Sequence, residues 1–345
     1  MADSPAGAAR AFTIADLKRV SAELARDALL IQGAGGNTSL KCDDVLWVKA
    51  SGCWLEDAEE KPVFVPLRTS VVLDNIARQA ADCRAGARLP DPPSDHLKPS
   101  IETALHAIMP HAAVIHAHAV NSTVTALLAD GRARFERAMD DDLHGLYLPY
   151  ATPGLPLANA VREAVTGDAS PDIILLENHG VVVGAESPDA AARLLKEVER
   201  RLALALRTLP EPDPKRLSAH EDVHYEALPF ASGMALDPHI FELLTTSVFT
   251  PDQVVFLGGP LACDGAPKTD GTAPALILRE GVGAYRRRDA SAGTRAVIDW
   301  LAHIAERIPE GAEVLSLPDR EVASLLGWDA EHYRLELDRN RKPRS

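Results

Sequence analysis

The sequence predicts an α/β protein in which helices flank a central sheet. Apolar residues with helical spacing alternate along the chain with short apolar runs typical of strands. Two of these runs lie on either side of Asn178-His179-Gly180, most simply as two antiparallel strands joined by a tight turn. Helices mixed with strands in this order favour a layered sandwich.

Several elements are predicted before the first break in composition. Thr13 is a plausible cap for the first helix, and Ser187-Pro188 open the last one, with proline where its missing donor is harmless. Between them, "GAGGNTSL" reads as a glycine-rich loop. The predicted elements are a helix over 13–31, a strand over 45–50, a helix over 68–85, a helix from Ser100 to Pro110, a buried strand over 111–120, the strand pair over 172–185 and a helix over 188–209.

The stretch "LPEPDPKRL" marks the clearest boundary, because three closely spaced prolines make a stiff, extended connector. We therefore divide the chain into a domain over 1–210, a linker over 211–217 and a smaller α/β domain over 218–345 with a basic tail. Beyond the linker we predict a helix over 238–246, strands over 253–258 and 274–280, and a helix over 291–307.

Composition favours a soluble, cytoplasmic protein. The net charge of -14 disfavours nucleic-acid binding, which requires clustered Lys and Arg. No apolar run approaches the length of a membrane span, and the first residues do not resemble a signal peptide. Four scattered cysteines without a C-x-x-C pair indicate reduced thiols.

Histidines at three positions indicate a metal site. His116 and His118 are two residues apart in a predicted strand and project from the same face, and His179 lies in the predicted turn. Three neutral imidazoles with one open position are typical of a catalytic zinc. Glu102 and His106 share one face of the preceding helix.

Each of these features also has a structural interpretation when taken alone. A histidine pair in a strand can be solvent-facing or hydrogen-bonded in the core, and Asn-His-Gly suits any turn. Their coincidence favours the metal, because each polar group buried without a partner costs about 1–3 kcal/mol.

Six motifs, in order, resemble the class II aldolase/adducin family: "GAGGNTSL", "VKASG", "PSIETALH", "HAHAVNSTVTAL", "YATPG" and "LENHGVVVGAES". The resemblance covers roughly residues 12–208. Within the family, this part of the chain is most similar to the aldolase part of bifunctional rhamnulose-phosphate aldolase/dehydrogenases. It implies a three-layer sandwich with a mainly antiparallel sheet. No dinucleotide-binding G-x-G-x-x-G motif follows a strand here.

The resemblance also implies roles for individual residues. His116, His118 and His179 match the family's metal ligands, and Glu102 matches its catalytic acid/base. The substrate's anionic group would be bound by five residues: Gly36, Asn37, Ser51, Gly52 and Ser100. We interpret His106 as a group that orients Glu102. Lys49 and Lys98 flank this predicted pocket; they are either positive charges that help to bind the phosphate or ordinary solvated lysines, and we favour the second interpretation.

The function implied is that of a divalent-metal-dependent aldolase, a carbon–carbon lyase that acts on a keto-sugar or sugar phosphate through a metal-stabilised enediolate. Zinc suits three histidines best, while manganese, cobalt and iron also bind such sites. A related decarboxylase, epimerase or dehydratase would use the same intermediate. A non-catalytic, adducin-like scaffold is the alternative from another class, and retention of all four site residues disfavours it. The family resemblance implies a homo-oligomer, with a tetramer favoured.

Overall fold

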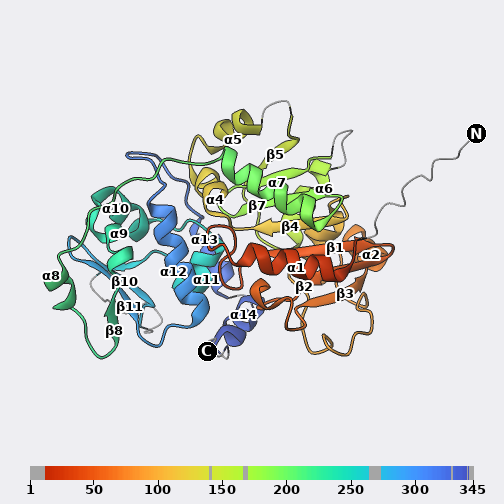
Figure 1. The fold of residues 1–345 in the computed structure, drawn as a ribbon, viewed down its shortest axis with the longest axis horizontal. Helices are drawn as coiled ribbons and strands as arrows, with labels where there is room; N and C mark the ends of the chain where they lie inside the picture. Colours follow the sequence, from red (N-terminus) through yellow and green to blue (C-terminus); the bar gives the residue numbers. More distant parts are fainter. Residues whose placement is uncertain are drawn as a thin grey trace, which may run out of the picture.

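The computed structural model describes residues 12–139, 142–165, 170–263, 273–327, 329–339 and 341, and it contains two β-sheets (Figure 1). The larger sheet has the strand order β3-β2-β1-β4-β7-β6-β5, and all neighbours are antiparallel except β5 and β6. Its strands are β1 (Asn37–Cys42), β2 (Val45–Lys49), β3 (Phe64–Arg68), β4 (Ala113–Ala117), β5 (Gly145–Leu148), β6 (Ile173–Leu176) and β7 (Gly180–Ala185). The predicted fold class, with its mainly antiparallel sheet, is confirmed.

Helices cover both faces of the larger sheet. One buried cluster joins it to α1 (Ile14–Ala25), α5 (Gly131–Met139) and α7 (Pro188–Arg201), and two others join it to α2 (Thr69–Ala77), α3 (Thr103–Ile108) and α6 (Leu155–Val165). Along β4, Ile115 packs in the cluster on the α1, α5 and α7 face of the sheet, and Val114 packs in a cluster on the opposite face, with Leu105 of α3. Because side chains alternate across a strand, His116 projects to the α3 side, where Glu102 lies.

The region after residue 206 contains a smaller sheet with the order β8-β11-β10-β9. Its strands are β8 (Tyr225–Ala227), β9 (Ala262–Cys263), β10 (Leu276–Arg279) and β11 (Gly283–Arg287). The helices of this region are α8 (Pro214–Ser218), α9 (Gly233–Leu236), α10 (Pro238–Thr246), α11 (Pro251–Leu257), α12 (Ala292–Ala305), α13 (Asp319–Leu326) and α14 (Asp329–Arg339). In Figure 1, α11, α12 and α13 lie between the two sheets.

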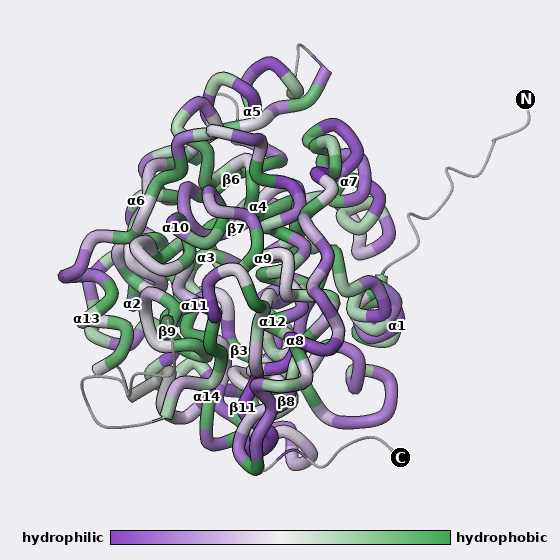
Figure 2. The backbone as a smooth tube through the Cα atoms, turned by 90° about the vertical axis from the view of Figure 1, so that its left-hand side faces the viewer, coloured by the Kyte–Doolittle hydropathy of each residue, from purple (hydrophilic) through white to green (hydrophobic). Residues whose placement is uncertain are grey.

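The C-terminal region packs closely against α4 (Val120–Leu127). Its largest buried cluster includes Val120, Val124 and Leu127 of α4 together with Trp300 and Leu301 of α12. Figure 2 shows hydrophobic residues along α4 and the inner strands, and hydrophilic residues on the peripheral α1. Residues of α4 thus contribute to the buried apolar core of the C-terminal region, and burial of this area favours the contact. Within the described ranges, no single helix is long and apolar enough to cross a membrane, and only the bent pair α10–α11 passes that test by length and composition.

Most predicted elements are present, but several boundaries differ. The helix over 238–246 and the antiparallel strand pair around residue 178 are confirmed, as are the caps Thr13 and Ser187. The predicted strand over 253–258 is wrong, because these residues belong to helix α11. Strand β1 falls where a loop was predicted, and α1, α2 and α7 end earlier than predicted, at residues 25, 77 and 201.

The helix α11 follows from local capping. Thr250 accepts a hydrogen bond from the backbone N–H of Gln253, and the Gln253 side chain accepts one from the backbone N–H of Phe249. Pro251 stands in the first turn, where its fixed φ suits a helix. This cap determines that the apolar run continues as a helix.

Candidate metal centre

The three histidines come together because β4 and the β6–β7 turn are adjacent. His116 lies in β4, His118 follows its last residue, and His179 is in the turn that begins β7. A Cβ at Gly180 would stand 2.5 Å from the carbonyl oxygen of Ala117. Glycine at 180 therefore allows the turn to approach β4 closely enough for the imidazoles to meet.

The imidazoles converge through their Nε2 atoms. Nε2 of His116 lies 3.1 Å from Nε2 of His118, and the ligand atoms of the three histidines all lie within 4.8 Å of one another. Oε1 of Glu102 lies 3.5 Å from Nε2 of His116 and 3.6 Å from Nε2 of His179. All four side chains are buried. The structure thus brings together the three predicted ligands and the predicted catalytic glutamate.

The chemistry of this donor set fits a divalent cation. Among the described residues, Oε1 of Glu102 is buried without a hydrogen-bond donor. Burial lowers the pKa of His116, and it lowers that of His179 to about 3, so both rings are neutral and offer a lone pair. Burial acts to raise the pKa of Glu102, but the adjacent imidazoles and a hydrogen bond from Asn37 lower it to about 2. A cation here would be the missing partner of these lone pairs.

A buried chain of hydrogen bonds positions Glu102. Nδ2 of Asn37 donates to Oε2 of Glu102 at 2.7 Å, so Oδ1 of Asn37 faces His106. Nε2 of His106 then donates to that oxygen, which leaves Nδ1 to accept from the Ser39 hydroxyl at 2.7 Å. Burial lowers the pKa of His106 to about 3, consistent with this neutral form. His106 contacts Asn37 and acts on Glu102 through it.

The predicted substrate-binding residues share one cavity with the histidines. The cavity measures about 40 Å³ and is lined by Gly36, Asn37, Ser51, Gly52, Ser100, Glu102, His118 and His179. Lys49 lines it too, but the interpretation of this residue as a solvated lysine was wrong. Its side chain is 3% exposed, its ammonium donates to the carbonyl oxygens of Ala34 and Gly36, and burial lowers its pKa to about 8. Lys49 thereby fixes the glycine-rich loop.

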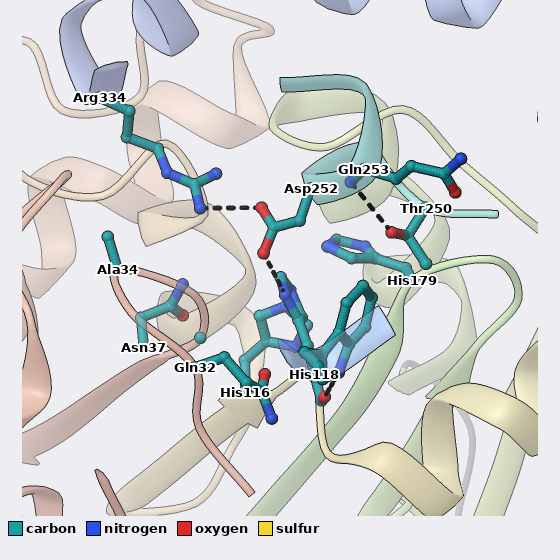
Figure 3. A network of polar contacts seen from close by, with 12 residues as sticks. Gln32, Ala34, Asn37, His116, His118, His179, Thr250, Asp252, Gln253 and Arg334 are labelled. Carbon is teal, nitrogen blue, oxygen red and sulfur yellow. Dashed lines mark hydrogen bonds and ion pairs between the residues drawn. The ribbon is translucent and has the colours of Figure 1, made fainter. Parts of the chain in front are cut away.

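Two charged residues of the C-terminal region also line the cavity and were missed in the sequence. Figure 3 shows Asp252 of α11 between His118 and Arg334 of α14. One carboxylate oxygen of Asp252 lies 2.8 Å from Nδ1 of His118, and the other accepts from Arg334 at 2.8 Å. Burial acts to raise the pKa of Asp252, and Arg334 and His118 outweigh it, so the pKa lies far below its usual range.

Comparisons with known proteins match the first part of the chain. Residues 15–206, more than half of the chain, match the model of the class II aldolase and adducin N-terminal domain. An uncharacterized oxidoreductase, YuxG, of Bacillus subtilis (strain 168) is 28% identical, and the alignment covers 47% of this chain and 25% of that protein. The chain therefore spans about a quarter of the length of this curated relative.

Solved structures resemble the same part. The N-terminal class II aldolase domain of a conserved protein from Thermoplasma acidophilum is 24% identical, with a TM-score of 0.48, and the match covers 58% of this chain and 98% of that chain. An L-fuculose 1-phosphate aldolase is also 24% identical, with a TM-score of 0.39 and coverage of 54% and 83%. Because the family-model match alone spans more than half of the sequence, this chain belongs to the class II aldolase and adducin family.

Proposed function

We propose that the chain is a divalent-metal-dependent aldolase, a carbon–carbon lyase acting on a keto-sugar or sugar phosphate. The observation that carries the proposal is the cluster of three buried histidines, two of which place Nε2 3.5 and 3.6 Å from Oε1 of Glu102, an atom without a hydrogen-bond donor among the described residues. Membership of the class II aldolase and adducin family supports it. A scaffold protein would have no need for this buried donor set, which is costly without a ligand.

The positions of the site residues support a distinct role for each of them. His116, His118 and His179 would hold the cation, which when bound would act as a Lewis acid on substrate oxygens. Glu102 is ionised, so it would accept a proton from the substrate and return it later as a general acid. Asn37 holds Oε2 of Glu102, which leaves Oε1 directed at the reaction centre.

The cavity wall supports a substrate with an anionic group. Ser51, Ser100 and Arg334 are among the residues that line the cavity. Hydroxyl and guanidinium groups are the usual donors to phosphate and carboxylate oxygens. A homo-oligomer, with a tetramer favoured, and a cytoplasmic location stay predictions, and light scattering of the purified chain measures the first.

Elemental analysis of the purified protein tests the metal centre. We expect about one divalent ion per wild-type chain and none in His116→Ala/His118→Ala. Zinc is expected first, and manganese, cobalt and iron would satisfy the same test. A wild-type protein that neither contains nor takes up any of these ions would contradict the proposal and favour the scaffold alternative.

A substrate screen tests the reaction. The metal-loaded enzyme is incubated with keto-sugars and their phosphates, and products are identified by mass spectrometry. Two shorter carbonyl compounds from one substrate are expected from an aldolase. Release of carbon dioxide, inversion of a carbon centre or loss of water would instead identify a decarboxylase, an epimerase or a dehydratase. Glu102→Gln should retain the metal and lose roughly 10²–10⁴-fold in rate.

A further inference from the structure

We propose that Asp252, which lies beyond the part of the chain that matches the family model, is a positioning residue for the metal ligand His118. This inference rests on the metal centre proposed above. It assigns to the C-terminal region a role in metal binding, in addition to its packing against α4.

The contacts of His118 carry the inference, because they differ from those of the other two histidines. Nδ1 of His116 faces a main-chain carbonyl oxygen, that of Val181, at 3.1 Å. Nδ1 of His179 has no hydrogen-bond partner among the described residues. Only His118, of these three, has a side-chain carboxylate on Nδ1, that of Asp252 at 2.8 Å.

This geometry fixes which nitrogen of His118 is available to the cation. A carboxylate on Nδ1 favours the tautomer in which Nδ1 carries the proton, so the lone pair is on Nε2. Nε2 of His118 is the atom that faces Nε2 of His116 at 3.1 Å. The carboxylate also orients the ring and raises the basicity of Nε2.

Asp252 is itself held rigidly. Arg334 donates to its second oxygen at 2.8 Å, and both side chains are largely buried. The C-terminal region also contacts the main chain of His118, because Nε1 of Trp300 in α12 donates to the His118 carbonyl oxygen at 2.8 Å. Residues of α11, α12 and α14 therefore hold this one ligand on both its ring and its backbone. Figure 3 shows the contacts on the ring side, from His118 to Asp252 and from Asp252 to Arg334.

The test is the dissociation constant for Zn²⁺, measured by competition with a chromophoric chelator on the full chain. We expect Asp252→Asn, which keeps the shape and removes the charge, to bind Zn²⁺ about 10–100-fold more weakly than wild type. Asp338→Asn is the matched control. Asp338 is also a buried carboxylate at the α14 interface, but it accepts from the backbone N–H of Gly293 and should leave the affinity unchanged.

A second variant covers the case in which Asp252→Asn does not fold. Arg334→Met keeps the contact between Asp252 and His118 and removes the cation that holds the carboxylate, so a smaller loss of affinity is expected. The absorption spectrum of the Co²⁺-loaded protein should change in both variants and stay as in wild type in Asp338→Asn, because it reports the ligand geometry directly.

Two results would overturn the inference: wild-type affinity in Asp252→Asn, or an equal loss in Asp338→Asn. If only Arg334→Met can be purified, wild-type affinity and spectrum in that variant overturn it. A wild-type protein that binds no divalent ion overturns the proposed function instead, so the two failures are distinguishable.

Discussion

Replacing His106 with leucine should destabilise the metal-free protein by about 2–6 kcal/mol. His106 is fully buried and connects Asn37 with Ser39. Leucine would leave Oδ1 of Asn37 and the hydroxyl of Ser39 without their partner, and each buried polar group left unpaired costs about 1–3 kcal/mol. That sum is a large fraction of the 5–15 kcal/mol that typically separates folded from unfolded states.

Urea denaturation followed by circular dichroism measures the effect. The protein is kept metal-free, because a bound ion would add its own stabilisation. With a denaturant slope of about 3 kcal/mol per molar, the upper end of the usual range because the chain is long, the midpoint should fall by roughly 0.7–2 M. His96→Leu is the matched control, since His96 is exposed and the same substitution there should change stability by no more than about 0.5 kcal/mol. Equal midpoints for wild type and His106→Leu would refute the hydrogen-bond chain.

Three further outcomes follow from the same contacts. The pKa of His106 is about 3 in the fold and about 6.5 when unfolded, so the unfolded chain binds more protons between these values. The urea midpoint should therefore fall as pH drops below about 6.5, with a smaller fall in His106→Leu; parallel pH profiles for the two proteins would contradict this. A chelator should lower the melting temperature of wild type and leave His116→Ala/His118→Ala unaffected, as calorimetry can check. Asn178→Ala removes two hydrogen bonds from the Asn178 side chain to the carbonyl oxygens of Phe249 and Leu315. It also places alanine at a positive φ of 53°, so the free energy of unfolding should fall by about 2–5 kcal/mol. A change under about 0.5 kcal/mol would exclude this contribution.

Features of the site that depend on residues close together in the sequence could be predicted from the sequence alone. His116, His118 and Glu102 could be selected because strand and helix periodicity place side chains on defined faces. His179 could be selected because it lies in the predicted tight turn, but the position of this turn beside β4 comes from the pairing of β7 with β4 in the structure. These features depend on near neighbours. The family motifs added the roles that spacing alone left open.

Other residues could not be selected, because their contacts form only in the packed protein. Asp252 is 134 residues from His118, and no periodicity relates α11 to β4. A usable signal for the helix was present, since Thr250-Pro251-Asp252-Gln253 has the residue types of a capped helix start. The burial of Lys49 could not be predicted from its place in a strand, because it depends on how the glycine-rich loop folds. The loop carbonyl oxygens of Ala34 and Gly36 accept from the Lys49 ammonium, which therefore faces the loop rather than solvent.

The size of the cavity has a kinetic consequence. About 40 Å³ of the cavity is open to water, and Arg334 of α14 forms part of its wall, so a withdrawal of α14 would widen the space for a substrate. Such a withdrawal would break the ion pairs of Arg334 with Asp252 and of Arg341 with Asp57 and lift Leu337 from Gly52, so Arg334 holds Asp252 only while the helix is closed. Opening and reclosure of the helix would then govern turnover, and rates would fall as solvent viscosity rises. Once closed, the same helix would exclude bulk water from the reacting atoms.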